Sequence, residues 1–253
     1  MNQNLISVFR IPQLKDNYSY IIANEKNAII IDPAESTSIV NYIKKKLFHP
    51  IAILLTHHHD DHTKGVVDIL QKYSIPVYSS NSNIKGTTNI VKDGSIINLS
   101  FINIDVISTP GHTLDHVIFY NKDNNILFSG DTLFRLGCGR VFEGTNYQMY
   151  KSLQKIFSLD DKTLVYCGHE YTNSNLKFLM SIFNGHEGLI SEAEKIDGQI
   201  LKTESSIPFS LGLEKELNPF LSTKSESYEN FKNVKNMSEI EMFSYLRDLK
   251  NSF

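Results

Sequence analysis

Short apolar runs that end in polar residues recur along the first two thirds of the chain. They are rich in β-branched residues and bounded by glycine, proline or asparagine, which is the pattern of buried strands. With the polar residues at their ends, these runs lie at 27–33, 51–59, 104–113, 125–132 and 162–170. Each run leads to histidine, aspartate or both, so the pattern predicts strands whose ends carry metal-capable side chains.

Apolar residues at helical spacing fall between these runs. One such pattern covers residues 39–47 and comes after Ser36 or Thr37, either of which could cap a helix. Two more cover residues 66–73 and 150–157. Strands interleaved with helices predict a layered α/β domain over residues 1–170.

The strand pattern stops after Tyr171. The remainder of the chain is helix-like, with a proline-bearing connection around residues 207–220. The helix-like segments lie at 174–183, 190–204 and 238–253. We therefore expect a smaller helical domain over residues 171–253.

Composition narrows the classes of protein that the chain could represent. Its 253 residues are 41% hydrophobic and 21% charged, which is typical of a globular protein. The net charge is −3 and no basic tract is present, so no nucleic-acid partner is expected. No apolar run approaches the roughly 20 residues that span a bilayer, and the N-terminal stretch lacks the pattern of a signal peptide.

Cysteine content and the absence of heptads predict the cellular location and the oligomeric state of the protein. Cys138 and Cys167 are too few for a disulfide scaffold, which favours a reducing, cytoplasmic location. Without coiled-coil heptads or an obvious apolar surface stripe, a monomer is the expected oligomeric state.

The segment LLTHHHDDHTKG, residues 54–65, concentrates the candidate chemistry. His57 and His59 are two positions apart, so on an extended segment they point the same way. Asp61 and His62 come where the next helix should begin. Their side chains should therefore face a second metal-binding position, different from the one that His57 and His59 face. His58 and Asp60 lie between these residues and should point away.

Together, the strand ends deliver enough side chains for two metal ions. The candidate ligands are five imidazoles and two carboxylates: His57, His59, Asp61, His62, His112, Asp131 and His169. Such ligands suit zinc, iron or manganese, with zinc favoured. A shared carboxylate, for which Asp131 is the natural candidate, could bridge two cations. A hydroxide between them would be the nucleophile of a hydrolase.

Each of these residues, taken alone, also has an interpretation that does not involve a specific metal centre. A lone His-x-His pair is common, and a histidine-rich loop can bind metal adventitiously. Asp32 could orient a ligand imidazole, or it could simply cap the turn before Pro33. The placement of seven candidates at successive strand ends favours a metal centre over these interpretations.

Several motifs resemble those of a known superfamily. THHHDDH fits the THxHxDH signature of the metallo-β-lactamases, and PGHT, SGDTLF and CGHEYT resemble its later metal motifs in order. Within that superfamily the chain is most similar to the glyoxalase II family of hydroxyacylglutathione hydrolases. The resemblance extends from DNYSYII through KGTT, VKDG, GCGRVFEGT and GHEYTNSNLKF to YLRDLKNSF, and so covers nearly the whole chain.

The resemblance implies a four-layered αβ/βα metallo-β-lactamase-like sandwich with a smaller C-terminal helical domain. It places His57, His59 and His112 on one of two divalent metal ions. Asp61, His62 and His169 would hold the other, with Asp131 bridging. Asp61 and Asp131 would then act in catalysis together with a metal-bridging hydroxide.

The implied reaction is hydrolysis of S-D-lactoylglutathione to glutathione and D-lactate, the second step of methylglyoxal detoxification. The small-molecule thioester would be the only partner, with no nucleic acid and no membrane. The family's glutathione-binding positions correspond to Arg140, Tyr171, Arg247 and Lys250. Without the resemblance, a solvated charged face would be the simpler interpretation of Arg247 and Lys250.

Four residues depart from the family pattern and bear on substrate affinity rather than on the hydrolytic centre. Arg140 replaces a lysine, Phe142 a tyrosine found in some members, Asp115 a small residue, and Ser222 an arginine common in bacterial members. Competing functions are a lactonase or β-lactamase of the same superfamily, a glutathione-dependent sulfur dioxygenase and a non-catalytic metal-binding module. The GCGR and FEGT segments and the Arg247–Lys250 pair argue against a lactonase or β-lactamase, because the metal chemistry requires neither. A single-iron sulfur dioxygenase would need fewer than the seven candidate ligands, and turnover would separate an enzyme from a metal-binding module.

Overall fold

The structure is a computed structural model that describes residues 6–253. The first five residues, part of the stretch in which no signal peptide is predicted, lie outside the described residues. No helix in the described part of the chain is both long and apolar enough to cross a membrane.

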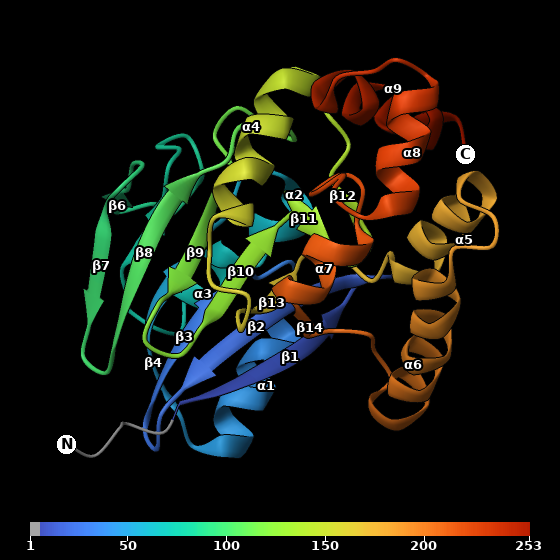
Figure 1. Cartoon of the computed structure of the whole chain (residues 1–253). Coiled ribbons are helices and arrows are strands. Elements are labelled where there is room, and N and C mark those ends of the chain that lie inside the picture. Colours follow the sequence, from blue (N-terminus) through green and yellow to red (C-terminus); the bar gives the residue numbers. More distant parts are fainter. Residues whose placement is uncertain (1–5) are drawn as a thin grey trace. The chain divides into compact units, whose positions relative to one another are not determined.

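Up to residue 167 the chain is mostly strands, with helices at 36–46, 60–63, 66–70 and 146–157 between groups of them, and helices dominate the remainder (Figure 1). The strands are β1 (Ser7–Gln13), β2 (Asn17–Ala23), β3 (Asn27–Ile31), β4 (His49–Leu54), β5 (Val77–Ser79), β6 (Asn89–Ile90), β7 (Ile96–Leu99), β8 (Ile102–Ser108), β9 (Val117–Asn121), β10 (Ile126–Gly130), β11 (Leu133–Phe134), β12 (Gly137–Cys138), β13 (Leu164–Cys167) and β14 (Phe209–Ser210). The helices are α1 (Ser36–Lys46), α2 (Asp60–Thr63), α3 (Val66–Leu70), α4 (Asn146–Phe157), α5 (Thr172–Ile182), α6 (Glu187–Thr203), α7 (Leu211–Leu217), α8 (Glu226–Val234) and α9 (Glu239–Ser252).

The chain forms two compact units. Unit 1 comprises the residues up to Ser108 together with Asp115–Lys122, and unit 2 comprises Thr109–Leu114 and Asp123–Phe253. The division predicted at residue 170 stays a prediction.

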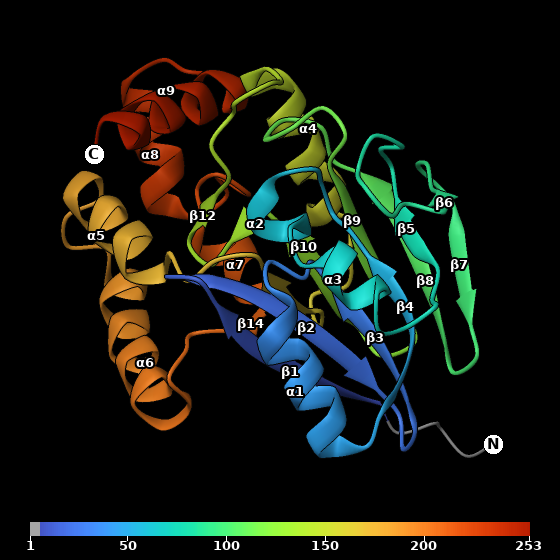
Figure 2. The same cartoon turned by 180° about the vertical axis from the view of Figure 1, so that it is seen from behind.

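Unit 1 is built on a sheet with the strand order β1-β2-β3-β4-β5-β6. The strands β1 to β3 are antiparallel, and β3 to β6 are parallel. Helices α1 and α3 lie side by side against one face of this sheet (Figure 2). The sheet and these helices share an apolar core, to which Ile30, Ile39 and Ile53 contribute, each fully buried. The antiparallel ladder β7-β8-β9 completes the unit.

The first helix begins and ends differently from its predicted pattern. Its N-cap is Glu35, in extended conformation and without a side-chain cap hydrogen bond, so neither Ser36 nor Thr37 caps it. Leu47 is the C-cap in left-handed conformation and is 88% exposed, although its spacing predicts an inward position. The helix ends one residue too early for Leu47 to reach the core.

Unit 2 contains the ladder β10-β13-β14 and the hairpin β11-β12. Strands β10 and β13 are parallel, so their ends at Gly130 and Cys167 lie at the same edge. The prediction that strands stop after Tyr171 is wrong at one place, because β14 pairs antiparallel with β13 through Phe209 and Ser210. Two residues are too short a run to leave a strand pattern in the sequence.

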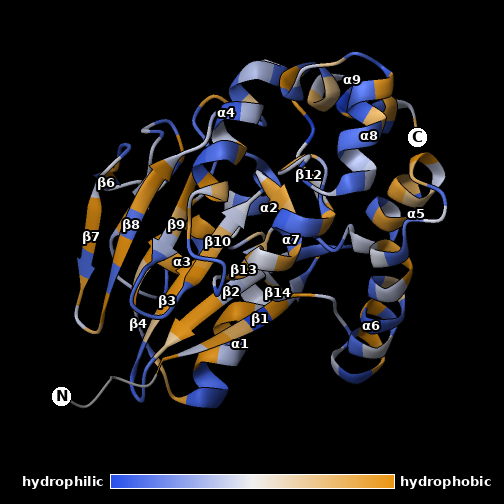
Figure 3. Cartoon of the chain, viewed as in Figure 1, coloured by the Kyte–Doolittle hydropathy of each residue, from blue (hydrophilic) through white to orange (hydrophobic). Residues whose placement is uncertain are grey.

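The rest of unit 2 is helical. Helix α4 packs against α9, and α5 packs against α6. Helices α5, α6 and α9 occupy the three segments predicted to be helical, whereas α7 and α8 were not predicted. Colouring by hydropathy shows orange, apolar residues along the strands, with polar positions interrupting β8, and a mixture of polar and apolar residues along α6 (Figure 3).

Candidate metal centre

The segment after β4 presents the first four candidate ligands. The chain leaves the sheet at Leu55 and enters the short helix α2 at Asp60, with His59 as the N-cap. His57 and His62 are buried, and His59 and Asp61 are partly buried. The extended-then-helical backbone turns alternate side chains to different sides, so four candidate ligands can come from six residues.

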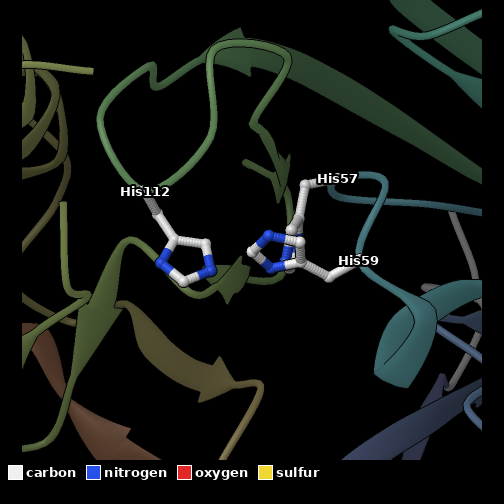
Figure 4. Close-up of side chains that lie close together, drawn as sticks. All are labelled: His57, His59 and His112. Carbon is white, nitrogen blue, oxygen red and sulfur yellow. The ribbon is translucent and has the colours of Figure 1, made fainter. Parts of the chain in front are cut away.

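One group of possible ligand atoms consists of His57, His59 and His112 (Figure 4). The ligand atoms of this group all lie within 4.8 Å of one another. His57 Nε2 is 3.0 Å from His59 Nδ1, and the two rings meet edge to face with centroids 4.7 Å apart. This contact is a hydrogen bond whose donor depends on the tautomers of the two rings, and neutral imidazole nitrogens are also ligands that zinc accepts.

Two further groups contain the other four candidates. His57, His62 and Asp131 form one, and Asp61, His62 and His169 form the other, again with all ligand atoms within 4.8 Å. The seven residues named from the strand ends therefore all belong to at least one group. The assignment of these residues to two metal ions stays a prediction.

Asp131 lies beside two of the imidazoles. Its Oδ2 atom is 3.4 Å from His112 Nε2 and 3.3 Å from His169 Nε2. All three side chains are nearly buried, with exposures of 6 to 7%. A carboxylate placed evenly between two imidazole nitrogens has the geometry of a ligand shared by two cations.

The imidazoles are oriented by hydrogen bonds at their second nitrogens. His112 Nδ1 donates to the carbonyl oxygen of Arg140 at 2.8 Å. Since a carbonyl can only accept, the proton of neutral His112 sits on Nδ1 and Nε2 keeps its lone pair for a metal. His62 Nδ1 lies 2.9 Å from Asp32 Oδ2, so of the two interpretations of Asp32 the structure supports the orienting one.

Two residues that sequence reasoning missed also support the site. Asn17, on β2, donates from Nδ2 to Asp61 Oδ2 at 2.9 Å. Thr56 donates from its backbone nitrogen and hydroxyl to the Asp32 carboxylate, at 2.8 and 2.6 Å. Thr56 lies in the predicted run 51–59, whereas no strand was predicted around Asn17, and a single asparagine or threonine carries no ligand pattern.

The two cysteines are not part of this donor set. Both are buried, and burial raises the pKa of the Cys138 and Cys167 thiols. A thiol with a raised pKa is a poor metal ligand near neutral pH. The available donors are therefore imidazole and carboxylate, which fit two zinc, iron or manganese ions and do not select among them.

The four predicted substrate-binding residues lie in unit 2 in differing environments. Arg140 is exposed, and its guanidinium contacts Asn251. Tyr171 stacks flat on His169, with centroids 4.7 Å apart and an interplanar angle of 6°. Arg247 is buried and donates to the carbonyl oxygen of Cys138 at 2.9 Å, so it does not belong to a solvated charged face. Lys250 donates to the carbonyl oxygen of Ser174 at 2.9 Å.

Two histidines beside the candidate ligands, His58 and His116, have other contacts. His58 Nδ1 lies 2.9 Å from Asp115 Oδ1, which accounts for the unusual acid at that position by a partner outside the seven candidates. His116 is buried and stacks on His57, with ring centroids 4.9 Å apart. Neither residue needs a metal to explain its place.

Comparisons with known proteins identify relatives of both parts of the chain. Residues 14–93 and 89–169 match the family model of the metallo-beta-lactamase superfamily, and residues 170–253 match that of the hydroxyacylglutathione hydrolase C-terminus. The hydroxyacylglutathione hydrolase of Nitrosomonas eutropha is 39% identical, covering 98% of this chain and 100% of the relative. The hydroxyacylglutathione hydrolase of Pectobacterium atrosepticum is 42% identical, covering 99% of this chain and 100% of the relative.

Solved structures share the fold. The crystal structure of the BLEG-1 B3 metallo-beta-lactamase matches with a TM-score of 0.65 at 24% identity, covering 85% of this chain and 99% of that one. At this identity the likeness concerns the fold alone. The predicted metallo-β-lactamase-like fold with a helical C-terminal region is confirmed.

Proposed function

We propose that this chain, which belongs to the hydroxyacylglutathione hydrolase family of the metallo-β-lactamase superfamily, hydrolyses S-D-lactoylglutathione and related 2-hydroxyacyl thioesters of glutathione. The products are glutathione and the free hydroxy acid. One observation carries the proposal beyond family membership: the Asp131 carboxylate lies 3.4 Å from His112 and 3.3 Å from His169, as a shared ligand would.

Two divalent ions would be held by the seven candidate residues. His57, His59 and His112 would bind one, Asp61, His62 and His169 the other, and Asp131 both. When bound, the ions supply Lewis acidity to the thioester carbonyl and to the attacking water. Zinc is the metal to test first, with iron and manganese as alternatives that the same donors accept.

The protein's own groups would set the protonation state of this centre. Asp32 and the Arg140 carbonyl oxygen hold His62 and His112 through Nδ1 and leave each Nε2 for a ligand bond. Asn17 fixes the Asp61 carboxylate by a hydrogen bond. The leaving group is a thiolate, which departs without strong protonation, so the site does not need a dedicated general acid.

Glutathione has two carboxylates, and the cations of unit 2 would recognise them. Arg247 is suited to this role because its buried Nε has no hydrogen-bond partner among residues 6–253. Burial and the neighbouring Arg247 lower the pKa of Lys250 to about 8, so it is mostly charged at neutral pH. Arg140 is exposed and near the end of α9, and Tyr171 would contact the substrate beside His169.

The cellular setting is part of the same proposal. Both cysteines are free and buried, which fits a reducing compartment, and we propose a cytoplasmic monomer whose partner is a small molecule. No nucleic-acid or membrane partner is part of the proposal. Light scattering of the purified protein would test the oligomeric state.

The deciding experiment is turnover of S-D-lactoylglutathione by the zinc-loaded protein, beside an Asp131→Ala variant. We expect efficient hydrolysis that falls by at least about a thousandfold in the variant, because one ligand is lost from both ions. A metal-replete wild type that is inert to this thioester would overturn the substrate assignment. The C-terminal family match disfavours the lactonase and sulfur dioxygenase alternatives, which the same assay would test with their own substrates.

A further inference from the structure

The β11-β12 hairpin occupies the stretch of chain between the ligand Asp131 and Arg140, whose carbonyl oxygen orients His112. After the hairpin, the chain returns directly against Asp131. A Cβ atom at Gly139 would lie 1.9 Å from the Asp131 carbonyl oxygen, so only glycine permits this approach. The position of the hairpin therefore sets the positions of two candidate ligands.

The turn of this hairpin is held by two side chains from α7 and its C-cap. The backbone nitrogen of Leu136 donates to Glu214 Oε2 at 2.8 Å. Asn218 Nδ2 donates to the carbonyl oxygen of Gly137 at 3.0 Å and to Glu214 Oε2 at 2.8 Å. Leu136 has a φ of 58°, a left-handed conformation that is unfavourable for leucine and needs such contacts to persist.

A purely structural role would not require polar side chains at Glu214 and Asn218, because apolar side chains would fill the same buried volume at a lower cost in free energy. Glu214 is 1% exposed and Asn218 is fully buried. Burying a carboxyl group costs more free energy than filling the same volume with an apolar side chain. The charged and titratable groups that face Glu214 are Arg135, Glu192 and Tyr228, and only the first is a cation.

We propose that Glu214 and Asn218 are positioning residues of the metal centre, which hold the Leu136–Gly137 turn and through it fix Asp131 and the Arg140 carbonyl oxygen. The inference deepens the proposed function and rests on it. A helix of the C-terminal region would thus contribute to metal binding as well as to substrate recognition.

The test compares variants of the full-length zinc protein. Asn218→Ala removes the donor to Gly137, and Glu214→Met removes the acceptor of Leu136 at similar volume. Glu214→Gln keeps an acceptor oxygen. The control is Ile196→Val, a buried change on α6 that removes one methylene and should lower stability by a comparable amount.

The readouts are zinc affinity, by competition with a chelator, and kcat and KM for the thioester. For Asn218→Ala and Glu214→Met we expect zinc affinity and kcat to fall about 10- to 100-fold, the range for lost support of metal ligands, with KM within about twofold of wild type. Glu214→Gln should keep most of the wild-type zinc affinity and kcat that Glu214→Met loses. Ile196→Val should leave zinc affinity and kcat unchanged.

Zinc affinity and kcat as high in the folded variants as in Ile196→Val would overturn the inference. If Asn218→Ala does not fold, Glu214→Met and its Gln counterpart decide the question. Failure of the proposed function is distinguishable, because a wild type without thioesterase activity would still report zinc affinity in the chelator assay.

Discussion

The Oδ2 atom of Asp32 lies 2.9 Å from Nδ1 of His62, and the two side chains are 4% and 1% exposed. The same carboxylate accepts two hydrogen bonds from Thr56, at the end of the neighbouring strand. Asp32 adopts a φ of 48°, a left-handed conformation that aspartate tolerates better than most residues. A carboxylate anchored in this way orients the imidazole and raises its basicity as a ligand.

Substitution of Asp32 should therefore weaken metal binding. For Asp32→Ala we expect zinc affinity to fall about 10- to 100-fold, because His62 loses its orienting acceptor. Chelator competition measures this directly. Asp32→Asn, which keeps one acceptor oxygen, should lose less. Wild-type zinc affinity in Asp32→Ala would show that His62 is not a ligand oriented by Asp32.

Gly139 offers a steric test of the same centre. In Gly139→Ala the new methyl group would lie 1.9 Å from the Asp131 carbonyl oxygen, so the backbone at Asp131 must move. We expect kcat for the thioester to fall at least about tenfold, since displacement of a ligand by a fraction of an ångström is costly in an active site.

Gly198→Ala is the matched control for this substitution. Gly198 lies inside α6, and a Cβ there meets nothing within 4 Å. It should leave kcat unchanged and raise stability by up to about 1 kcal/mol, because alanine is the better helix former. Equal kcat in the two variants would contradict the close approach of Gly139 to Asp131.

Substrate affinity should depend on the charge of Lys250. Its pKa is lowered to about 8 by burial and by Arg247, so the ammonium group is lost as the pH rises through 8. We expect KM for the thioester to increase between pH 7 and pH 9 in the wild type. In Lys250→Met, KM should be high at both pH values and vary little. A wild-type KM that stays constant over this range would speak against a charged contact from Lys250.

Stability should depend on pH through Glu214. Burial raises its pKa to about 8, above the ordinary value of 4.5, so the folded state retains a proton that the unfolded state releases. This contribution is fully present below pH 4.5 and is lost as the pH rises to about 8. Glu214→Gln removes the titration, so its Tm should decline less than that of the wild type between pH 5 and pH 8. Parallel Tm profiles for the two proteins would refute this account.

The sequence alone determined which strands carry the candidate ligands and which residues those candidates are. Buried strands such as β3 and β10 are continuous apolar runs, and the polar residues at their ends stand out because burial of such groups is costly. The motifs around these ends also indicated the family. The hydrophobic pattern did not predict helices α7 and α8 or the strands β1, β2, β5, β6, β7, β9, β11, β12 and β14. Four of these strands, β6, β11, β12 and β14, have two residues each, which is too few for a periodic pattern.

Only the tertiary structure decided which atoms support those ligands. The choice between two roles for Asp32 depended on its distance to His62, 30 positions away. The hydrogen bond that Glu214 accepts from Leu136 and the one that Asn218 donates to Gly137 join residues 78 and 81 positions apart. Local propensity and hydrophobic period report on neighbours within a few turns of the chain, whereas a hydrogen bond across such a separation exists only once the segments have folded together.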